Sequence, residues 1–204
     1  MTNPALILAS ASPRRSDLLR QLGLRFEQIV SPEQEPPPQG SDAEAWAVLS
    51  ARAKAGAVWR LLQARTPTSA RHLVVGADTV VCCDQQLLGK PVDEADADRM
   101  LTMLSGRDHT VCTGVTVMGA GIEHSACEVT RVFMSPISPP AVAAYVASGE
   151  PEGKAGSYAI QGRGGRFVER VEGCYYNVVG LPLARFCALL ESAGYDLDLP
   201  QDME

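Results

Sequence analysis

The segment HTVCTGVTVMGAGIEHSACEVTRVFM, residues 109–134, constrains the fold of this chain more than any other feature. It predicts a long β-hairpin hinged at Gly119–Gly121. The preceding segment HLVVGADTVVCCDQQLLG, residues 72–89, predicts a buried strand that is interrupted at Gly76 and followed by a turn at Asp84-Gln85. A sheet with long strands in the middle of the chain is therefore expected.

Shorter elements surround these strands. Residues 5–30 predict a β-α-β unit with a parallel pair of strands at 5–9 and 25–30, joined by a helix that begins at Pro13 and ends at Gly23. Residues 31–40, with three consecutive prolines, predict a stiff loop. The pattern as a whole predicts an α/β fold. The chain contains no internal repeat and no flexible linker, so residues 1–204 are expected to form a single domain.

The other helices are marked by caps and by apolar spacing. Ser41-Asp42-Ala43-Glu44 has the form of a capping box and predicts a helix that runs to about Arg65. Its apolar residues at helical spacing are Ala45, Val48, Leu49, Ala55, Val58, Trp59 and Leu62. Further helices are expected at 94–104, from Ser138 to Gly149, and at 182–194, whereas 156–180 is glycine-rich and β-like.

Composition and charge narrow the class of protein. The net charge of −6 argues against non-specific binding to nucleic acid. The charge is uneven: residues 1–71 carry 9 Lys/Arg and 6 Asp/Glu, and residues 72–204 carry 9 and 18. The six cysteines show neither C-x-x-C spacing nor zinc-type spacing, as expected for buried thiols in a reducing compartment. With no signal-like N-terminus and no membrane-length apolar run, a cytoplasmic protein without a membrane partner is expected.

The segment LASASPRRSDLL, residues 8–19, places cations where helices usually place acids. Ser12 is the expected N-cap and Pro13 the first helical residue, so Arg14 and Arg15 lie in the positive first turn. Two guanidinium groups beside unpaired backbone N–H groups predict a site for a phosphate or a carboxylate. The alternative is a pair of exposed arginines that bind acids elsewhere on the surface.

Asp78 is a lone acid within the β-branched run VVGADTVV. Burying a carboxylate is costly unless it is paired, hydrogen-bonded or bound to a cation. This favours a general base or a metal ligand at a cleft over an aspartate that caps a bulge. Glu33 or Glu35, in the proline-rich loop, could complete a site for Mg²⁺ or Mn²⁺ with Asp78, although both could equally be solvated loop acids.

Two further segments carry candidate binding residues. Lys90, between Gly89 and Pro91, has little conformational freedom, whereas Lys54 could be an ordinary solvated helix lysine. In KAGSYAIQGRGG, residues 154–165, small residues allow close approach of a ligand to the backbone, and the amide of Gln161 can read a nucleobase edge. His109 has no matched serine or cysteine, and no catalytic role is assigned to it.

Six segments in this order and spacing resemble the Maf family of nucleotide pyrophosphatases. They are LASASPRR, VVGADTVV, LGKP, LSGRDHTVCTGV, KAGSYAIQGRGGRFV and NVVGLPL, and together they span about residues 5–190. The resemblance implies an elongated mixed sheet with flanking helices, in two lobes around a central cleft, related to inosine-triphosphate pyrophosphatases and usually dimeric. It also implies metal-dependent hydrolysis of nucleoside triphosphates to monophosphate and pyrophosphate.

Within the resemblance, Ala77-Asp78-Thr79 and Ile160-Gln161-Gly162 match the branch that acts on dTTP and UTP. Asp78 matches the general base, and Glu35 falls at the position of a metal-contacting acid, although Gln34 stands where a second acid is common. The positions associated with substrate binding and choice are Ser10, Ser12, Arg14, Arg15, Lys54, Thr79, Lys90 and Gln161. The alternatives are a 7-methyl-GTP pyrophosphatase and a nucleotide-binding regulator of septum formation.

Overall fold

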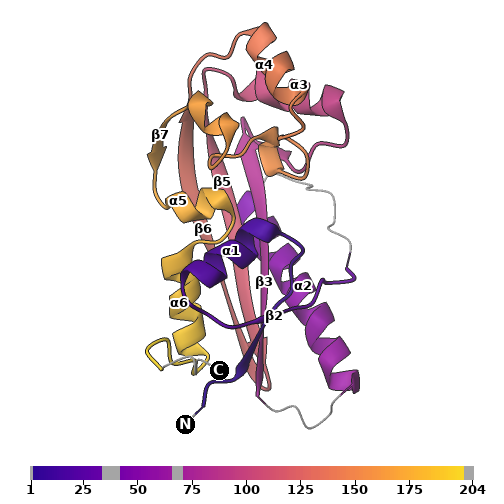
Figure 1. Ribbon diagram of the computed structural model, residues 1–204, viewed down its shortest axis with the longest axis vertical. Helices are drawn as coiled ribbons and strands as arrows, with labels where there is room; N and C mark the ends of the chain where they lie inside the picture. Colours follow the sequence, from indigo (N-terminus) through magenta and orange to yellow (C-terminus); the bar gives the residue numbers. More distant parts are fainter. Residues whose placement is uncertain (1, 34–41, 66–70, 200–204) are drawn as a thin grey trace.

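The computed structural model describes residues 2–33, 42–65 and 71–199. Its centre is a seven-stranded mixed sheet in the order β2-β1-β3-β5-β6-β7, with β4 paired to β3 (Figure 1). The strands are β1 (Ala5–Leu8), β2 (Glu27–Gln28), β3 (His72–Cys83), β4 (Gln86–Leu88), β5 (Asp108–Gly119), β6 (Ile122–Met134) and β7 (Val168–Glu172). The strand β1 is parallel to β2 and β3, and every other pairing is antiparallel. The predicted α/β fold, the parallel opening unit and the long hairpin are confirmed.

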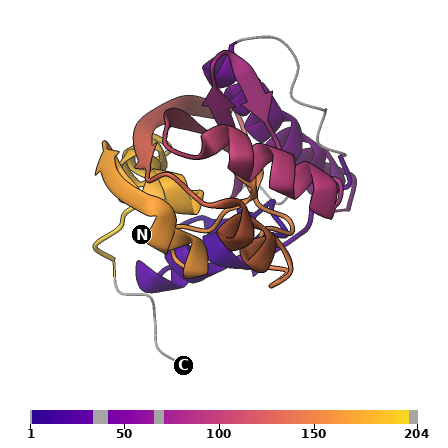
Figure 2. The ribbon, with the colours of Figure 1, turned by 90° about the horizontal axis from the view of Figure 1, so that it is seen from above.

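Helices cover both faces of this sheet, with α2 on one side and α1, α5 and α6 on the other (Figures 1 and 2). The helices are α1 (Pro13–Gln21), α2 (Ala43–Arg65), α3 (Glu94–Leu104), α4 (Pro139–Val146), α5 (Tyr175–Val179) and α6 (Leu183–Ser192). Two short 3₁₀ turns, η1 (Ala155–Ser157) and η2 (Arg163–Phe167), precede β7. The residues between 156 and 180 therefore form mainly turns and a short helix, and the prediction of a β-like segment was wrong except for β7.

The buried face of α2 agrees with the predicted one in the second half of the helix, where Ala55 and Val58 are buried in one cluster and Trp59 and Leu62 pack against that cluster, but differs from it in the first half. Leu49 is 61% exposed and Ala45 is also exposed, whereas Ala47, Ser50, Ala51 and other small residues face the sheet. In that first half the larger apolar side chains were a misleading guide, because the helix packs there too closely for them. Of the predicted capping box, Ser41 lies outside the described residues, and Asp42 Oδ1 accepts a hydrogen bond of 2.9 Å from the Ala45 N–H.

Two glycines explain the close packing of α2. A Cβ atom at Gly76 of β3 would come closer than 3.0 Å to the carbonyl oxygen of Ala51, and one at Gly114 of β5 would collide with Ala47. The strand β3 runs through Gly76 without a break, so the predicted interruption was wrong. This glycine admits the helix backbone instead.

One edge of β3 is left open in its middle. The strand β1 pairs with residues 72–75 and β4 with residues 81–83, so neither strand covers 76–80 on that side. On the other side, β5 pairs continuously from Val74 to Cys82. The gap lies beyond the carboxyl end of β1, where ligands commonly bind in α/β sheets.

The core is divided into two large hydrophobic clusters. One cluster contains side chains of α1, α6, β1, β3 and β5 and includes Leu19 and Phe186. The other contains side chains of α3 and α4 and includes Leu101 and Tyr145. Within the described residues, no helix combines the length and the apolar character that crossing a membrane requires.

Candidate active site

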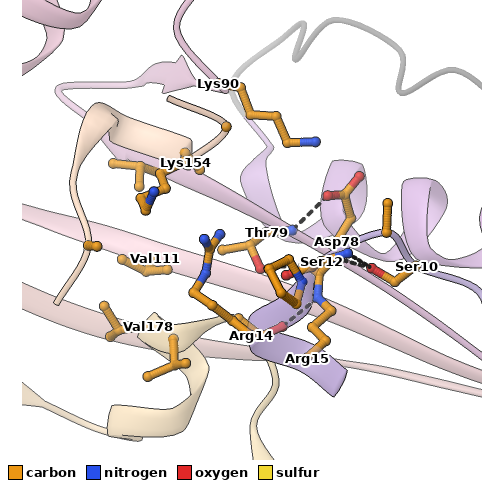
Figure 3. A pocket seen from close by; sticks show the side chains of 18 of the residues that line it. Ser10, Ser12, Arg14, Arg15, Asp78, Thr79, Lys90, Val111, Lys154 and Val178 are labelled. Carbon is orange, nitrogen blue, oxygen red and sulfur yellow. Dashed lines mark hydrogen bonds between the residues drawn. The ribbon is translucent and has the colours of Figure 1, made fainter. Parts of the chain in front are cut away.

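A cavity of about 310 Å³ lies at the open edge of β3 (Figure 3). It is bordered by Val179 from one hydrophobic cluster and by Val81 and Tyr158 from the other. The sequence-predicted residues that line it are Ser10, Ser12, Arg14, Arg15, Glu33, Lys54, Asp78, Thr79, Lys90 and Gln161. Glu35 lies outside the described residues. Residues scattered over most of the chain thus meet in one hollow.

Asp78 is 3% exposed and is surrounded by hydrogen-bond donors. Its Oδ2 accepts from the Lys54 ammonium at 3.0 Å and from the Ser50 hydroxyl, and its Oδ1 accepts from the Thr79 N–H at 2.9 Å. These donors satisfy a buried negative charge and fix the carboxylate at the cavity wall. The alternative in which Asp78 caps a bulge is wrong, because β3 is continuous there.

Lys54 and Ser50 reach Asp78 because they lie four residues apart on α2 and so share one helix face. Both are buried, Lys54 at 7% and Ser50 at 1% exposure, so Lys54 is not a solvated helix lysine. Ser50 was missed by the sequence analysis. The available signal was a hydroxyl placed one turn before Lys54 on the face that approaches the sheet.

The loop after β1 and the first turn of α1 form another wall. Ser12 is the N-cap, as predicted, but its side chain makes no capping hydrogen bond, and its N–H donates to Ser10 Oγ at 3.2 Å. Arg15 is 7% exposed and donates to Ser10 Oγ, Thr79 Oγ1 and the Gly180 carbonyl at 2.8 to 3.1 Å. Its guanidinium group therefore joins α1, β3 and the end of α5.

Thr79 continues this network away from the cavity. Its hydroxyl lies 2.9 Å from the Thr113 hydroxyl, which donates to the Asn177 carbonyl at 3.1 Å. If Thr113 gives its proton to Asn177, Thr79 donates to Thr113 and accepts from Arg15. The side chains of these two adjacent residues of β3 thus lie on opposite faces of the sheet, with Asp78 toward α2 and Thr79 toward α1.

Arg14 and Lys154 are half-buried cations in the cavity wall (Figure 3). Burial lowers the pKa of Arg14, and the adjacent charge of Arg15 lowers it further. Burial also lowers the pKa of Lys154, as does the positive charge of Arg14. Lys154 Nζ donates to the Glu152 carbonyl at 3.2 Å. Lys154 was not predicted, because nothing in its local sequence sets it apart from other surface lysines.

Lys90 and Lys154 come from adjoining segments, since the Gly156 N–H donates to the Gly89 carbonyl at 3.1 Å.

Among the described residues that line the cavity, five are cationic and two are acidic. The acids are Asp78 and Glu33, and Glu33 also forms an exposed ion pair with Arg60 at 3.1 Å. The cavity is therefore positively charged within an acidic protein, and it suits a polyanion.

Two further observations concern metals and His109. In the part of the chain that the structure describes, no three His, Cys, Asp or Glu side chains gather to hold a metal ion. His109 is buried in the core, where Nε2 lies 2.9 Å from the Tyr158 hydroxyl. Burial lowers the pKa of His109 to about 4, although the charge of Asp108 opposes this shift.

Known proteins with similar sequences carry a consistent name. The chain is 49% identical over 195 residues to a dTTP/UTP pyrophosphatase of Pelotomaculum thermopropionicum, covering 94% of this chain and 98% of that protein. It is 47% identical over 183 residues to a dTTP/UTP pyrophosphatase of Vibrio cholerae, covering 90% and 95%.

The fold and the family follow from two further comparisons. The Ham1 protein of Staphylococcus aureus superposes with a TM-score of 0.50 over 93% of this chain and 99% of that one, at 12% identity, and so shares its fold. The family model described as Maf-like protein matches residues 5–193. Together with relatives that match almost the whole chain, this match shows that the chain belongs to the Maf family.

Proposed function

We propose that this chain hydrolyses dTTP and UTP to the nucleoside monophosphate and pyrophosphate. Relatives at 47–49% identity that carry the name dTTP/UTP pyrophosphatase support this activity. The observation that carries the proposal is the position of Asp78, a buried carboxylate in the wall of a cavity that is lined by five cations. A general base beside a polyphosphate site is what hydrolysis of a phosphoanhydride needs.

In the proposed reaction, the cations hold the triphosphate and Asp78 receives the proton of the attacking water. The water oxygen bonds to the α-phosphorus while the α–β bridging bond breaks, and pyrophosphate leaves with the bond electrons. A triphosphate carries about four negative charges, and the leaving group gains more, so electrostatic stabilisation dominates. Arg14, Lys90 and Lys154 are placed to supply it, and Lys54 both holds Asp78 and adds positive charge.

Arg15 is proposed to act mainly on the shape of the phosphate site. Its three hydrogen bonds hold Ser10, Thr79 and Gly180 together, and its charge contributes to the field in the cavity. Ser10 and Ser12 would then present their hydroxyls beside the N-terminus of α1, where phosphates bind readily.

A divalent cation, Mg²⁺ or Mn²⁺, fits this donor set. Such ions are usually held by one or two carboxylates together with substrate phosphates and water, so a full cage of protein ligands is not needed. Asp78 would hold the ion, with Glu33 in the same cavity wall or Glu35 as a second carboxylate. The ion would supply further stabilisation of charge on the phosphates.

Gln161 is proposed to read the nucleobase. It is exposed and borders the cavity, and its amide can match both a donor and an acceptor on a pyrimidine edge. Thr79 and Arg14 are proposed to contribute to the choice of substrate with it. The apolar side chains of Val111 and Val178 line the same cavity and offer a surface for a flat ring (Figure 3).

Three coarser proposals accompany this function. A cytoplasmic location is supported by six cysteines that are all free thiols. A single domain is supported by Ile160, which packs against both large hydrophobic clusters. A homodimer is proposed from the family resemblance alone.

The test is a panel of nucleoside triphosphates incubated with the purified protein and Mg²⁺, with monophosphate, pyrophosphate and orthophosphate quantified. We expect the highest kcat/KM with dTTP and UTP, and one pyrophosphate for each monophosphate. A preference for 7-methyl-GTP, release of orthophosphate, or binding without turnover would each overturn the proposal.

A further inference from the structure

Gln161 lies in the segment 159–164. A network of hydrogen bonds joins the end of α4 to the backbone at both ends of this segment. We propose that Tyr145 and Glu150 are positioning residues that hold Gln161 in place and thereby set nucleobase selectivity. This inference rests on the proposed role of Gln161. Neither Tyr145 nor Glu150 lines the cavity, whereas Ala159, Ile160 and Gln161 do.

The network consists of four hydrogen bonds. The Tyr145 hydroxyl donates to Glu150 Oε1 at 2.8 Å and accepts from the Ala159 N–H at 3.1 Å. The Glu150 carboxylate accepts from the Arg163 and Gly164 N–H groups, both at 3.0 Å. The backbone is thus fixed two residues before Gln161 and two residues after it.

The backbone of the segment is shaped to receive these two side chains. A Cβ atom at Gly162 would come closer than 3.0 Å to the Glu150 carboxylate, and one at Gly164 would come equally close to the Tyr145 hydroxyl. Glycine at these two positions therefore permits the backbone to approach the carboxylate and the phenol. The sequence analysis interpreted the small residues of this segment as room for a ligand. At Gly162 and Gly164 they make room for Glu150 and Tyr145 instead.

The two side chains of this network, Tyr145 and Glu150 (the anchor), are held in place by packing and by hydrogen bonds. Tyr145 is 1% exposed, and its ring packs edge-to-face on Phe167, with the ring centres 5.3 Å apart. Burial raises the pKa of Tyr145, so the phenol keeps its proton. Burial alone would raise the pKa of Glu150, but the hydrogen bonds from Gly164, Arg163 and Tyr145 outweigh it and lower the pKa, so the carboxylate stays charged.

A fixed Gln161 matters because an amide discriminates bases only when its donor and acceptor are held in register with the base edge. Without the anchor, binding of the base would have to order the segment, which weakens binding of the preferred nucleotide more than that of others. The proton-transfer machinery at Asp78 would be left in place. The inference therefore predicts an effect on KM and selectivity and none on kcat.

The experiment compares Tyr145→Phe and Glu150→Gln with wild type, using dTTP and dCTP as substrates. We expect KM for dTTP to rise about 5- to 20-fold, kcat to stay within about 2-fold, and the dTTP/dCTP ratio of kcat/KM to fall. In a Gln161→Ala background, the same substitutions should change this ratio by less than about 2-fold, because the group they position is gone. Hydrogen exchange at residues 159–164 should become faster in both variants.

Tyr195→Phe is the matched control, since Tyr195 is also buried, at 3% exposure, but belongs to the other hydrophobic cluster. Its selectivity and exchange should match wild type. An equal loss with both nucleotides, an unchanged ratio, or unchanged exchange at 159–164 would overturn the positioning role. If wild type fails to prefer dTTP, the proposed function fails instead, and the exchange measurement still reports on the anchor because it needs no nucleotide.

Discussion

The ammonium nitrogen of Lys54 lies 3.0 Å from Oδ2 of Asp78, and both side chains are more than nine-tenths buried. Taking two charges out of water costs more than such a pair usually returns in stability. The pair forms only because α2 lies close against β3, over Gly76. We infer that this pair serves the chemistry of the cavity rather than the stability of the fold.

Replacing Asp78 by asparagine removes the proposed proton acceptor. Asparagine is nearly isosteric and keeps one oxygen as an acceptor, so the variant should fold, as judged by circular dichroism. We expect kcat for dTTP to fall by at least about 100-fold. Asp84→Asn is the control, since Asp84 is an exposed acid at the end of the same strand, paired with Arg107. Turnover close to wild type in Asp78→Asn would refute the assignment.

Ser50→Ala removes one of the donors to Asp78 while leaving Lys54 in place. A hydrogen bond to a charged group is worth about 1.5–3 kcal/mol, so a misplaced carboxylate should lower kcat by about 10-fold. Steady-state kinetics with dTTP would measure this. Ser192→Ala, at the end of α6, removes a hydroxyl that donates to the Ala188 carbonyl of the same helix and should leave kcat unchanged. If Ser50→Ala matches that control, the serine has no part in placing Asp78.

Lys154→Gln tests the cation that the sequence did not reveal. Because Lys154 lines the cavity near Arg14, its loss should raise KM for dTTP by about 10-fold, with a smaller effect on kcat. Arg170→Gln removes a charge from the exposed strand β7, where Arg170 pairs with Glu172, and should not change KM. A KM that is equally insensitive to both substitutions would exclude Lys154 from the substrate site.

Gly76→Ala tests the close packing of α2. The added methyl group would collide with the backbone of Ala51, and overpacking of this kind costs about 1–3 kcal/mol or more. The free energy of unfolding, measured in urea, should fall accordingly, and activity should fall with it because Lys54 moves away from Asp78. Gly56→Ala, inside α2 with its nearest contact at 3.4 Å, should be neutral or stabilising. Equal stability of the two variants would contradict this account.

His109 predicts a pH dependence of stability. Its pKa is about 4 in the folded protein, against 6.5 for the unfolded reference, so the unfolded chain binds more protons between these values. The free energy of unfolding should therefore fall as pH drops from about 6.5 to about 4, by ~3 kcal/mol from this group. His109→Gln should flatten this part of the pH profile. Identical profiles for wild type and His109→Gln would disprove it.

The extent to which the sequence predicts this structure depends on how local each signal is. The hairpin, the helix at 94–104 and the start of α1 follow from patterns within a few residues, and the structure confirms them. The buried face of the first half of α2 was mispredicted because tertiary packing there favoured small residues over the larger apolar ones. The turns at 155–167 were missed because glycines there serve contacts with Tyr145 and Glu150, which no local pattern reveals.

The candidate site shows the same division. Arg14 stands out locally as a cation in a positive helix turn, and Asp78 as an acid within a strand. Lys90 stands out as a lysine between a glycine and a proline, and Gln161 as a polar residue among small ones. Ser50 and Lys154 have no such contrast with their neighbours, and only their spatial relation to Asp78 and Arg14 identifies them.

The uncovered stretch of β3 has a consequence for how the enzyme can change its substrate. In a fully paired sheet, neighbouring residues of a strand are separated by the sheet itself and never meet the same molecule. Here Asp78 and Thr79 line one cavity, although their side chains lie on opposite faces of the sheet. If Asp78 serves cleavage and Thr79 recognition, as proposed, the two functions occupy separate layers of the protein. Mutations beneath Thr79 would then alter which nucleotide is accepted without disturbing α2, which holds Asp78.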